Sequence, residues 1–187
     1  MEIEVKVPVE DLAVLRTQVE KLAYPRTRER HFEANTLFDY PDRSLSASGC
    51  LIRVRETTDG ALLTFKGRVV QHDRYKMRPE CETNCDTPQA VKTILQNLGL
   101  RAFFRYEKYR EEYKSEDVSV CLDELPFGSF LELEGTPEGI ERVAAALGLD
   151  DKTFEKRSYA AIYAEMRRAA GKPFGDIVFE DEDNADT

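Results

Sequence analysis

Pairs of like charges two residues apart recur along this chain of 187 residues. Glu2 and Glu4 form an acidic pair at the start, and Arg53 and Arg55 form a basic pair further on. Side chains two residues apart on a β-strand share one face, about 7 Å apart. Like charges so placed repel each other unless an opposite charge or a ligand neutralises them. The arrangement recurs at Lys76 and Arg78, Glu80 and Glu82, Lys108 and Arg110, and Glu132 and Glu134.

These pairs indicate two kinds of bound ion. The acidic pairs are suited to a multivalent cation, because carboxylates bind Mg²⁺ together with the phosphate oxygens of a substrate. The basic pairs are suited to a multivalent anion, because arginine and lysine neutralise phosphates. On any single strand, charges that face solvent are the simpler explanation. Their repetition on nearly every strand favours a metal-bound polyphosphate.

Alternating apolar and polar residues predict the strands that carry these pairs. We expect strands at 1–7, 31–40, 50–57, 61–67, 74–83, 102–113, 118–125 and 129–134. Helices are expected at 9–22, 87–98, 138–147 and 153–170. Pro79 lies inside one expected strand and predicts an edge or a bulge there, since proline lacks an amide hydrogen. The pattern indicates one α+β domain over residues 1–170, followed by an acidic tail at 171–187 that we expect to be solvated and disordered from residue 175 onward.

Composition narrows the class of protein. The formal net charge of −9 argues against a nucleic-acid-binding surface, which is normally basic. No apolar run approaches the roughly 20 residues of a membrane span, and the start is acidic, so we expect a cytoplasmic protein without a membrane partner. Four cysteines with only His31 and His72 to supplement them do not form a zinc motif, and we expect reduced thiols.

The charged pairs belong to a set of motifs that follow one another from residue 1 to about 165. The set begins with Glu2-x-Glu4-x-Lys6 and ends with Ser158-Tyr159. Between these lie Thr36-Leu37-Phe38-Asp39, Leu51-Ile52-Arg53-Val54-Arg55, Thr64-Phe65-Lys66-Gly67, Arg78-x-Glu80-x-Glu82, Lys108-x-Arg110, Asp123 and Gly128-x-Phe130-x-Glu132-x-Glu134. In this set the chain resembles the CYTH domain, or triphosphate tunnel metalloenzyme, superfamily. Within it, the chain looks most like the CyaB-type class IV adenylate cyclases.

The resemblance implies a fold and a site. The fold would be an eight-stranded closed antiparallel β-barrel with helices packed outside and a charged tunnel inside. The tunnel would bind Mg²⁺ or Mn²⁺ through Glu2, Glu4, Glu132 and Glu134. The positions that match the residues gripping the triphosphate are Lys6, Arg53, Arg55, Lys66, Arg78, Lys108 and Arg110. Glu80 and Glu82 match further tunnel carboxylates, and the candidate catalytic residues are Glu134, Asp123 and Lys156, the last from a helix at the tunnel mouth.

Three functions fit this reading. The first is a class IV adenylate cyclase that converts ATP to cyclic AMP and pyrophosphate. The second is a triphosphatase that hydrolyses inorganic tripolyphosphate, thiamine triphosphate or a nucleoside triphosphate. Class IV cyclases often carry a His-Phe segment before the acidic motif, and its absence ahead of Glu2 weakens the first reading. The third is a non-catalytic module that binds polyphosphate or a nucleotide, and the presence of both acidic pairs favours an enzyme over it. The resemblance also admits a homodimer.

Overall fold

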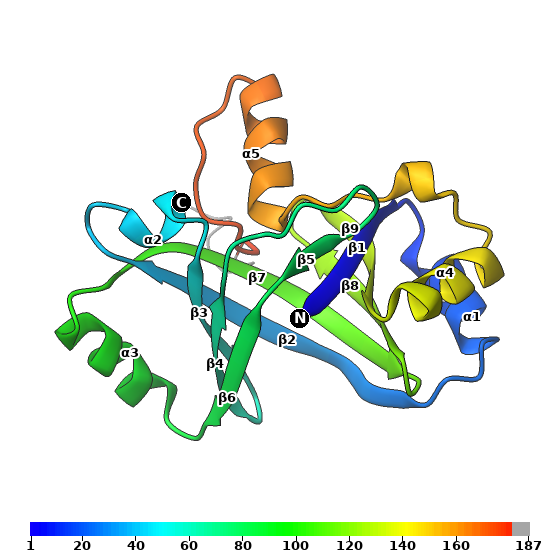
Figure 1. Ribbon diagram of the computed structural model, residues 1–187, viewed down its shortest axis with the longest axis horizontal. Helices are drawn as coiled ribbons and strands as arrows, with labels where there is room; N and C mark the ends of the chain where they lie inside the picture. Colours follow the sequence, from blue (N-terminus) through cyan, green and yellow to red (C-terminus); the bar gives the residue numbers. More distant parts are fainter. Residues whose placement is uncertain (181–187) are drawn as a thin grey trace.

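One antiparallel sheet of nine strands curls into a nearly closed barrel in this computed structural model, which describes residues 1–180 (Figure 1). The strand order around the barrel is β5-β1-β9-β8-β7-β2-β3-β4-β6. The strands are β1 (Glu2–Val9), β2 (Arg26–Asp39), β3 (Leu51–Thr57), β4 (Gly60–Lys66), β5 (Lys76–Arg78), β6 (Glu80–Cys85), β7 (Arg101–Lys114), β8 (Val118–Leu125) and β9 (Gly128–Gly135). The α+β barrel expected from the sequence is confirmed.

Pro79 explains why the barrel has nine strands where the sequence predicts eight. The two edges of the sheet, β5 and β6, are separated in the chain by this one residue. Arg78 lies opposite Glu2 on β1, while Glu80 lies opposite Lys66 on β4. Proline has no amide hydrogen to donate, so the single strand expected over 74–83 is divided here. The Pro79 carbonyl still accepts a hydrogen bond from the Gly67 amide at 2.8 Å, and the two short strands bring the edges together.

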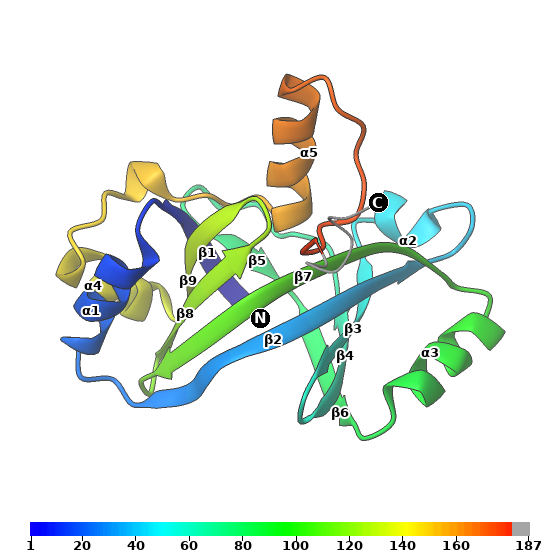
Figure 2. The same ribbon diagram turned by 180° about the vertical axis from the view of Figure 1, so that it is seen from behind.

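Helices cover the outside of the barrel. They are α1 (Leu12–Glu20), α2 (Ser44–Ala47), α3 (Pro88–Asn97), α4 (Pro137–Ala146), the 3-10 turn η1 (Asp151–Thr153) and α5 (Tyr159–Ala169). Seen from both sides, α1 and α4 lie together at one side of the barrel and α3 lies at the other, while α5 stands apart over the barrel (Figures 1 and 2). None of the helices in residues 1–180 is long and apolar enough to cross a membrane.

The helix expected over 153–170 begins later than predicted. Residues 154–158 are not helical, because the backbone of Glu155 pairs with that of Lys6 on β1. The Lys6 amide donates to the Glu155 carbonyl at 3.0 Å, and the Glu155 amide donates to the Lys6 carbonyl at 2.7 Å. The helix then starts at Tyr159, where the Ser158 side chain caps it by accepting a hydrogen bond from the Ala161 amide. This places the first turn of α5 at the mouth of the barrel.

The apolar faces of the strands point outward, under the helices. Val5 and Leu133 from the sheet pack with Val19 of α1 and Ile140 of α4, and each of the four is completely buried. On the other side, Phe38 and Val54 pack with Leu95 of α3. Residues alternate between the two faces of a strand, so apolar outer faces leave the charged residues facing inward. The charged interior and the outer cover of helices implied by the resemblance are both present in this barrel.

The chain beyond α5 returns to the barrel. We call residues 172–180 the C-terminal strap; it descends beside α5 and ends against β7 (Figure 1). The Ile177 amide donates to the Arg105 carbonyl at 3.0 Å, and the Ile177 carbonyl accepts from the Glu107 amide at 2.7 Å. Strand β8 pairs with β7 from Tyr109 onward, so the earlier part of β7 offers a free edge to the strap. The disorder predicted for the end of the tail, from residue 175, is therefore wrong for residues 175–180, while residues 181–187 lie outside the described part.

Candidate functional site

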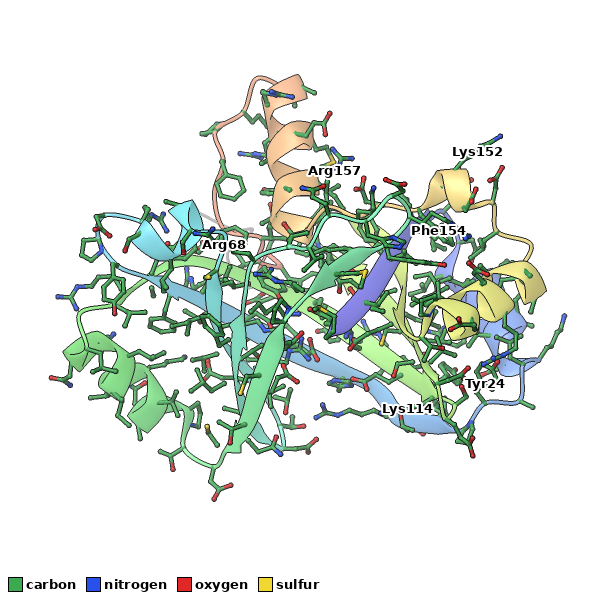
Figure 3. The ribbon with its side chains drawn as sticks, in the orientation of Figure 1. Tyr24, Arg68, Lys114, Lys152, Phe154 and Arg157 are labelled. Atoms are coloured by element: carbon green, nitrogen blue, oxygen red, sulfur yellow. The ribbon has the colours of Figure 1, made fainter. Side chains whose placement is uncertain are left out.

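A cavity of about 430 Å³ opens into the barrel and is lined by many charged side chains and by a smaller number of apolar ones. Figure 3 shows side chains filling the space between the strands around it. The charged lining consists of Glu2, Glu4, Lys6, Arg53, Arg55, Lys66, Lys76, Arg78, Glu80, Glu82, Lys108, Arg110, Glu132 and Glu134. The structure thus brings together all the predicted site residues except Asp123 and Lys156.

The register of β1 and β9 sets the acidic part of the cavity. Glu4 lies directly opposite Glu134, and Lys6 lies directly opposite Glu132. Residues opposed in this way share one face, with their Cβ atoms about 5 Å apart. The strands therefore hold two carboxylates against each other at the Glu4–Glu134 position. Such a pair is stabilised by a cation placed between or beside its members.

Two carboxylates of the cavity have raised pKa values, because they are buried and lie near other carboxylates. Burial, followed by the charges of Glu132, Glu2 and Glu4, raises the pKa of Glu134 to about 6. Burial and the neighbouring Glu2 carboxyl raise the pKa of Glu80 to about 8, against the opposing effect of Lys66. The Glu2 Oε2 atom is buried and finds no hydrogen-bond donor among residues 1–180. A buried carboxylate oxygen without a donor, within a group of carboxylates, fits a divalent cation as its ligand.

Lysines neutralise part of this acidic group. The Lys6 Nζ atom lies 2.8 Å from Glu4 Oε1 and 3.0 Å from Glu132 Oε2. Burial would lower the pKa of Lys6, but the two carboxylates outweigh it and hold the pKa above its ordinary value. Lys66 Nζ lies 2.5 Å from Glu2 Oε1, and Lys76 also pairs with Glu4. The cavity therefore interleaves the predicted metal ligands with the predicted phosphate ligands.

The predicted carboxylate ligands are spread over the cavity wall. In the part of the chain that the structure describes, the group of three potential ligands with all donor atoms within 4.8 Å of one another is instead His31, Glu33 and Glu112. Within it, Glu33 is paired with Arg55 at 3.2 Å and with Lys108 at 3.5 Å. Because two cations already neutralise Glu33, we interpret this group as an ion-pair network that positions Arg55 and Lys108.

Asp123 organises the basic side of the cavity from behind it. Its carboxylate accepts two hydrogen bonds from the Arg110 guanidinium, at 2.6 and 2.5 Å, and one from Lys108 at 3.1 Å. The Tyr159 hydroxyl donates a fourth, at 2.7 Å. Asp123 is fully buried and lies outside the residues that line the cavity. Asp123 is therefore placed to position Lys108 and Arg110, and the catalytic role expected from the sequence stays a prediction.

Arg53 offers a donor to an anion in the same cavity. Its terminal nitrogens contact the Tyr106 hydroxyl and the Thr64 hydroxyl, both at 3.2 Å. The Nε atom is buried and meets no acceptor within residues 1–180. Arg53 and the neighbouring lysine and arginine groups outweigh the effect of burial and lower the pKa of Tyr106. The guanidinium also pairs with Glu82 at 3.4 Å, so Nε is the donor left without a partner, and a phosphate oxygen would fit it.

Two predicted residues have other tasks. The Arg78 guanidinium lines the cavity, but its donors reach the backbone carbonyls of Gly67, Lys66 and Gly49 at 2.5 to 3.2 Å. Arg78 thus holds together the chain around Pro79, and a role in gripping phosphate would require it to leave these carbonyls. Lys156 precedes α5 and donates a hydrogen bond to the Asp73 carbonyl at 2.7 Å. It is exposed and does not reach the cavity lining, because the expected helix that would have carried it inward is absent there.

Three residues in or behind the cavity wall were not among the predicted site residues, although Lys76 was already noted in a charged pair with Arg78. Lys76 lies on the inward face of β5, and the alternation that identified Arg78 and Glu80 also includes it. Tyr106 has the same relation to Lys108 on β7. Glu33, fully buried behind the cavity, precedes the inward-facing Leu37 by four residues. Strand alternation, extended to every position of each strand, would have found all three.

Replacing Glu80 by Gln tests its raised pKa. The ordinary pKa of a glutamate, 4.5, lies below the value of about 8 in the folded protein. Between these values the folded protein holds a proton that the unfolded chain releases, so the free energy of unfolding falls as pH rises. We expect Glu80→Gln to unfold at the same temperature as the unmodified protein near pH 4.5 and at a higher temperature near pH 8.5, both measured in EDTA. Glu56→Gln, which removes a charge paired with Lys92 outside the cavity, is the control. If the unfolding temperatures of Glu80→Gln and the unmodified protein differed by the same amount at both pH values, the raised pKa of Glu80 would be contradicted.

Comparisons with known proteins agree with this geometry. The CYTH domain family matches residues 1–159. A protein of Methanocaldococcus jannaschii described as a "putative adenylate cyclase" is 28% identical over 135 residues, which are 72% of this chain and 76% of that protein. A Vibrio parahaemolyticus structure with the same description has a TM-score of 0.74 and 23% identity, over 87% of this chain and 97% of its own. A Hippeastrum protein described as a "putative adenylyl cyclase" with a dominant triphosphatase activity has a TM-score of 0.64 and 19% identity, over 92% of this chain and 97% of its own.

Proposed function

This chain belongs to the CYTH domain family, and on that premise we propose that it is a divalent-metal-dependent enzyme that acts on a triphosphate. The observation that carries the proposal is that two buried polar atoms without hydrogen-bond partners belong to residues that line the same cavity. Glu2 Oε2 is a buried carboxylate oxygen without a donor, and Arg53 Nε is a buried donor without an acceptor, among the residues described. A metal-bound polyphosphate supplies both missing partners, a cation for the first and an anion for the second.

The residues of the cavity divide the work of holding this substrate. Lys108 and Arg110, fixed by Asp123, present positive charge to the phosphates. Lys6 and Lys66 now pair with carboxylates, and a phosphate that accepted their hydrogen bonds would release Glu4, Glu132 and Glu2. A divalent cation held by these carboxylates and Glu134 would neutralise charge on the phosphate oxygens. Positioning and charge neutralisation are the main sources of catalysis in phosphoryl transfer.

Glu134 is suited to accept the proton of the nucleophile. Its pKa of about 6 leaves it mostly ionised at neutral pH while keeping it basic enough to take a proton. In cyclisation, the ribose 3′-oxygen would form a bond to the α-phosphorus, and the bond from that phosphorus to the bridging oxygen would break. Pyrophosphate would leave with the electron pair, and the hydroxyl proton would pass to the Glu134 carboxylate.

We put adenylate cyclisation first, because the relative of Methanocaldococcus jannaschii that covers most of this chain is described as a "putative adenylate cyclase". Hydrolysis of a triphosphate is the second candidate. It requires only that water takes the place of the ribose hydroxyl, and the Hippeastrum neighbour, which shares the fold, is described as having a dominant triphosphatase activity. The same lysines, arginines and carboxylates would serve both reactions.

The products distinguish these reactions. The protein would be incubated with ATP, thiamine triphosphate or tripolyphosphate, each with Mg²⁺ or Mn²⁺, and cyclic AMP, pyrophosphate and phosphate would be measured. Cyclic AMP and pyrophosphate in equal amounts from ATP would support a cyclase, and phosphate release would support a triphosphatase. Absence of every product from all three substrates would overturn the enzyme proposal and leave a binding module.

Mg²⁺ binding should depend on pH. Protonation of Glu134 competes with a cation for the same carboxylate, and its pKa is about 6. We expect the apparent affinity for Mg²⁺ to fall as pH drops from 7 to 5, by up to about tenfold per pH unit below 6, by the linkage of one proton to one cation. Calorimetric titration of Mg²⁺ at several pH values measures this, and Glu134→Gln should remove the dependence. An affinity that stays constant across pH 6 would show that Glu134 is not a ligand.

A further inference from the structure

The C-terminal strap supplies a part of the cavity that lies beyond the family match. That match ends at residue 159, whereas Phe174 of the strap lines the cavity. The strap is fixed below this residue by the backbone hydrogen bonds of Ile177 to β7, and Ile177 is almost fully buried. The Arg105 amide and side chain also hold the carboxylate of Asp176, at 2.8 and 2.9 Å. Phe174 is therefore held at the cavity by a chain segment anchored immediately after it.

Phe174 presents an open aromatic surface. Its ring stacks on that of Phe104 with centroids 5.2 Å apart and an interplanar angle of 16°. Phe104 below it is 3% exposed, whereas Phe174 remains 53% exposed. Tyr163 of α5 contacts the same ring at a tilted angle, with centroids 6.2 Å apart. A large apolar side chain so exposed beside a charged cavity is available for stacking with a planar group.

The lining of the cavity changes from apolar to cationic along β7. The lining residues of this strand follow in the order Phe104, Tyr106, Lys108 and Arg110. Lys108 lies four residues from Phe104, roughly 14 Å along the strand. Leu37 of β2 lies directly opposite Phe104 and extends this apolar end, with Arg53 of β3 on its other side. A bare tripolyphosphate would use the cationic end alone and leave this apolar end in water.

We propose that Phe174 is a specificity-determining residue that stacks on the planar aromatic group of an organic triphosphate. The inference rests on the proposed function and narrows it to substrates such as a nucleoside triphosphate or thiamine triphosphate. The phosphates of such a substrate occupy the Lys108 and Arg110 end, and its aromatic group covers the open face of Phe174. The residue contacts the part of the substrate that does not react.

Phe174→Ala tests this role with two kinds of substrate. We expect the KM for the organic triphosphate to rise about tenfold, since loss of an aromatic stacking partner has effects of this size or larger on nucleotide binding. The KM or inhibition constant for tripolyphosphate should change by less than about twofold, because this anion has no aromatic group to stack on the ring. Tripolyphosphate is measured as a substrate or, if it is not turned over, as a competitive inhibitor. Separate measurements with ATP and thiamine triphosphate show which aromatic group is bound.

Phe179→Ala is the matched control. Phe179 belongs to the same strap and packs on Tyr109 with centroids 5.2 Å apart, but it does not line the cavity. It should leave every constant unchanged, and Phe174→Tyr should keep the affinity for the organic substrate. An equal change for tripolyphosphate and the organic triphosphates in Phe174→Ala, or no change for any, would overturn the inference. If the unmodified protein turns over no triphosphate at all, the proposed function itself fails.

Discussion

Replacing Glu4 by Gln should lower kcat/KM with Mg²⁺ by about a thousandfold or more, because a bound cation contributes several kcal/mol to stabilising the charge of a phosphoryl transition state. Glu4 lies opposite Glu134, is 4% exposed, and is paired with Lys6 and Lys76. Lys6 and Lys76 hold the pKa of Glu4 well below its ordinary range against the effect of burial, so the side chain is a permanent anion. The neutral amide of glutamine keeps its shape but not its charge, and the Mg²⁺ affinity should fall together with the rate.

The barrel should survive this change. Lys6 retains Glu132 as its partner at 3.0 Å, and the outer apolar faces of the strands are not altered. Circular dichroism should therefore stay close to that of the unmodified protein, while the unfolding temperature should fall, because Lys76 loses its carboxylate partner. Glu56→Gln removes a carboxylate paired with Lys92 outside the cavity and should keep full activity. Unchanged turnover of Glu4→Gln would refute the metal assignment.

Replacing Asp123 by Ala should have its main effect on the stability of the fold. The substitution leaves Arg110 and Lys108 buried with one fewer carboxylate each, and it leaves the Tyr159 hydroxyl without its acceptor. Removing one partner of a buried ion pair typically lowers the free energy of unfolding by about 3–5 kcal/mol. Urea unfolding, followed by tyrosine fluorescence or circular dichroism, measures this loss.

Two other variants separate positioning from catalysis at this residue. Asp123→Asn keeps acceptor and shape, so it should lose less stability than Asp123→Ala and keep a reduced activity. Asp117→Ala breaks a much more exposed pair, with Arg142, and should change the unfolding free energy far less than Asp123→Ala. If Asp123→Ala were as stable as the unmodified protein but inactive, the catalytic role expected from the sequence would stand instead.

The alternation of residue types determined the barrel and most of its lining. A strand places every second side chain on the same face, so a run such as Leu131-Glu132-Leu133-Glu134 allows one inner face and one outer face only. The apolar members had to lie under helices, as Leu133 does against Ile140. Paired charges on the other face indicated the chemistry of a metal and a polyphosphate before any contact was known. The position of Pro79 also predicted an irregularity in this strand, and it is the point at which β5 and β6 are divided.

Only the tertiary structure decided which charge meets which. Lys66 pairs with Glu2, and Arg110 with Asp123, through contacts between strands whose pairing depends on the closure of the whole barrel. Burial is likewise a property of the folded chain, which is why Asp123 lies behind the cavity while Glu132, its neighbour across Arg110, lines it.

The paths of the segments that precede and follow α5 also could not be predicted from local sequence patterns. Lys156 stays outside because Glu155 pairs with the backbone of β1, and Phe174 reaches the cavity because β7 leaves an edge for Ile177. Both are backbone hydrogen bonds between segments far apart in the sequence. Every amide and carbonyl can form them, so the side-chain pattern carries no record of which ones do.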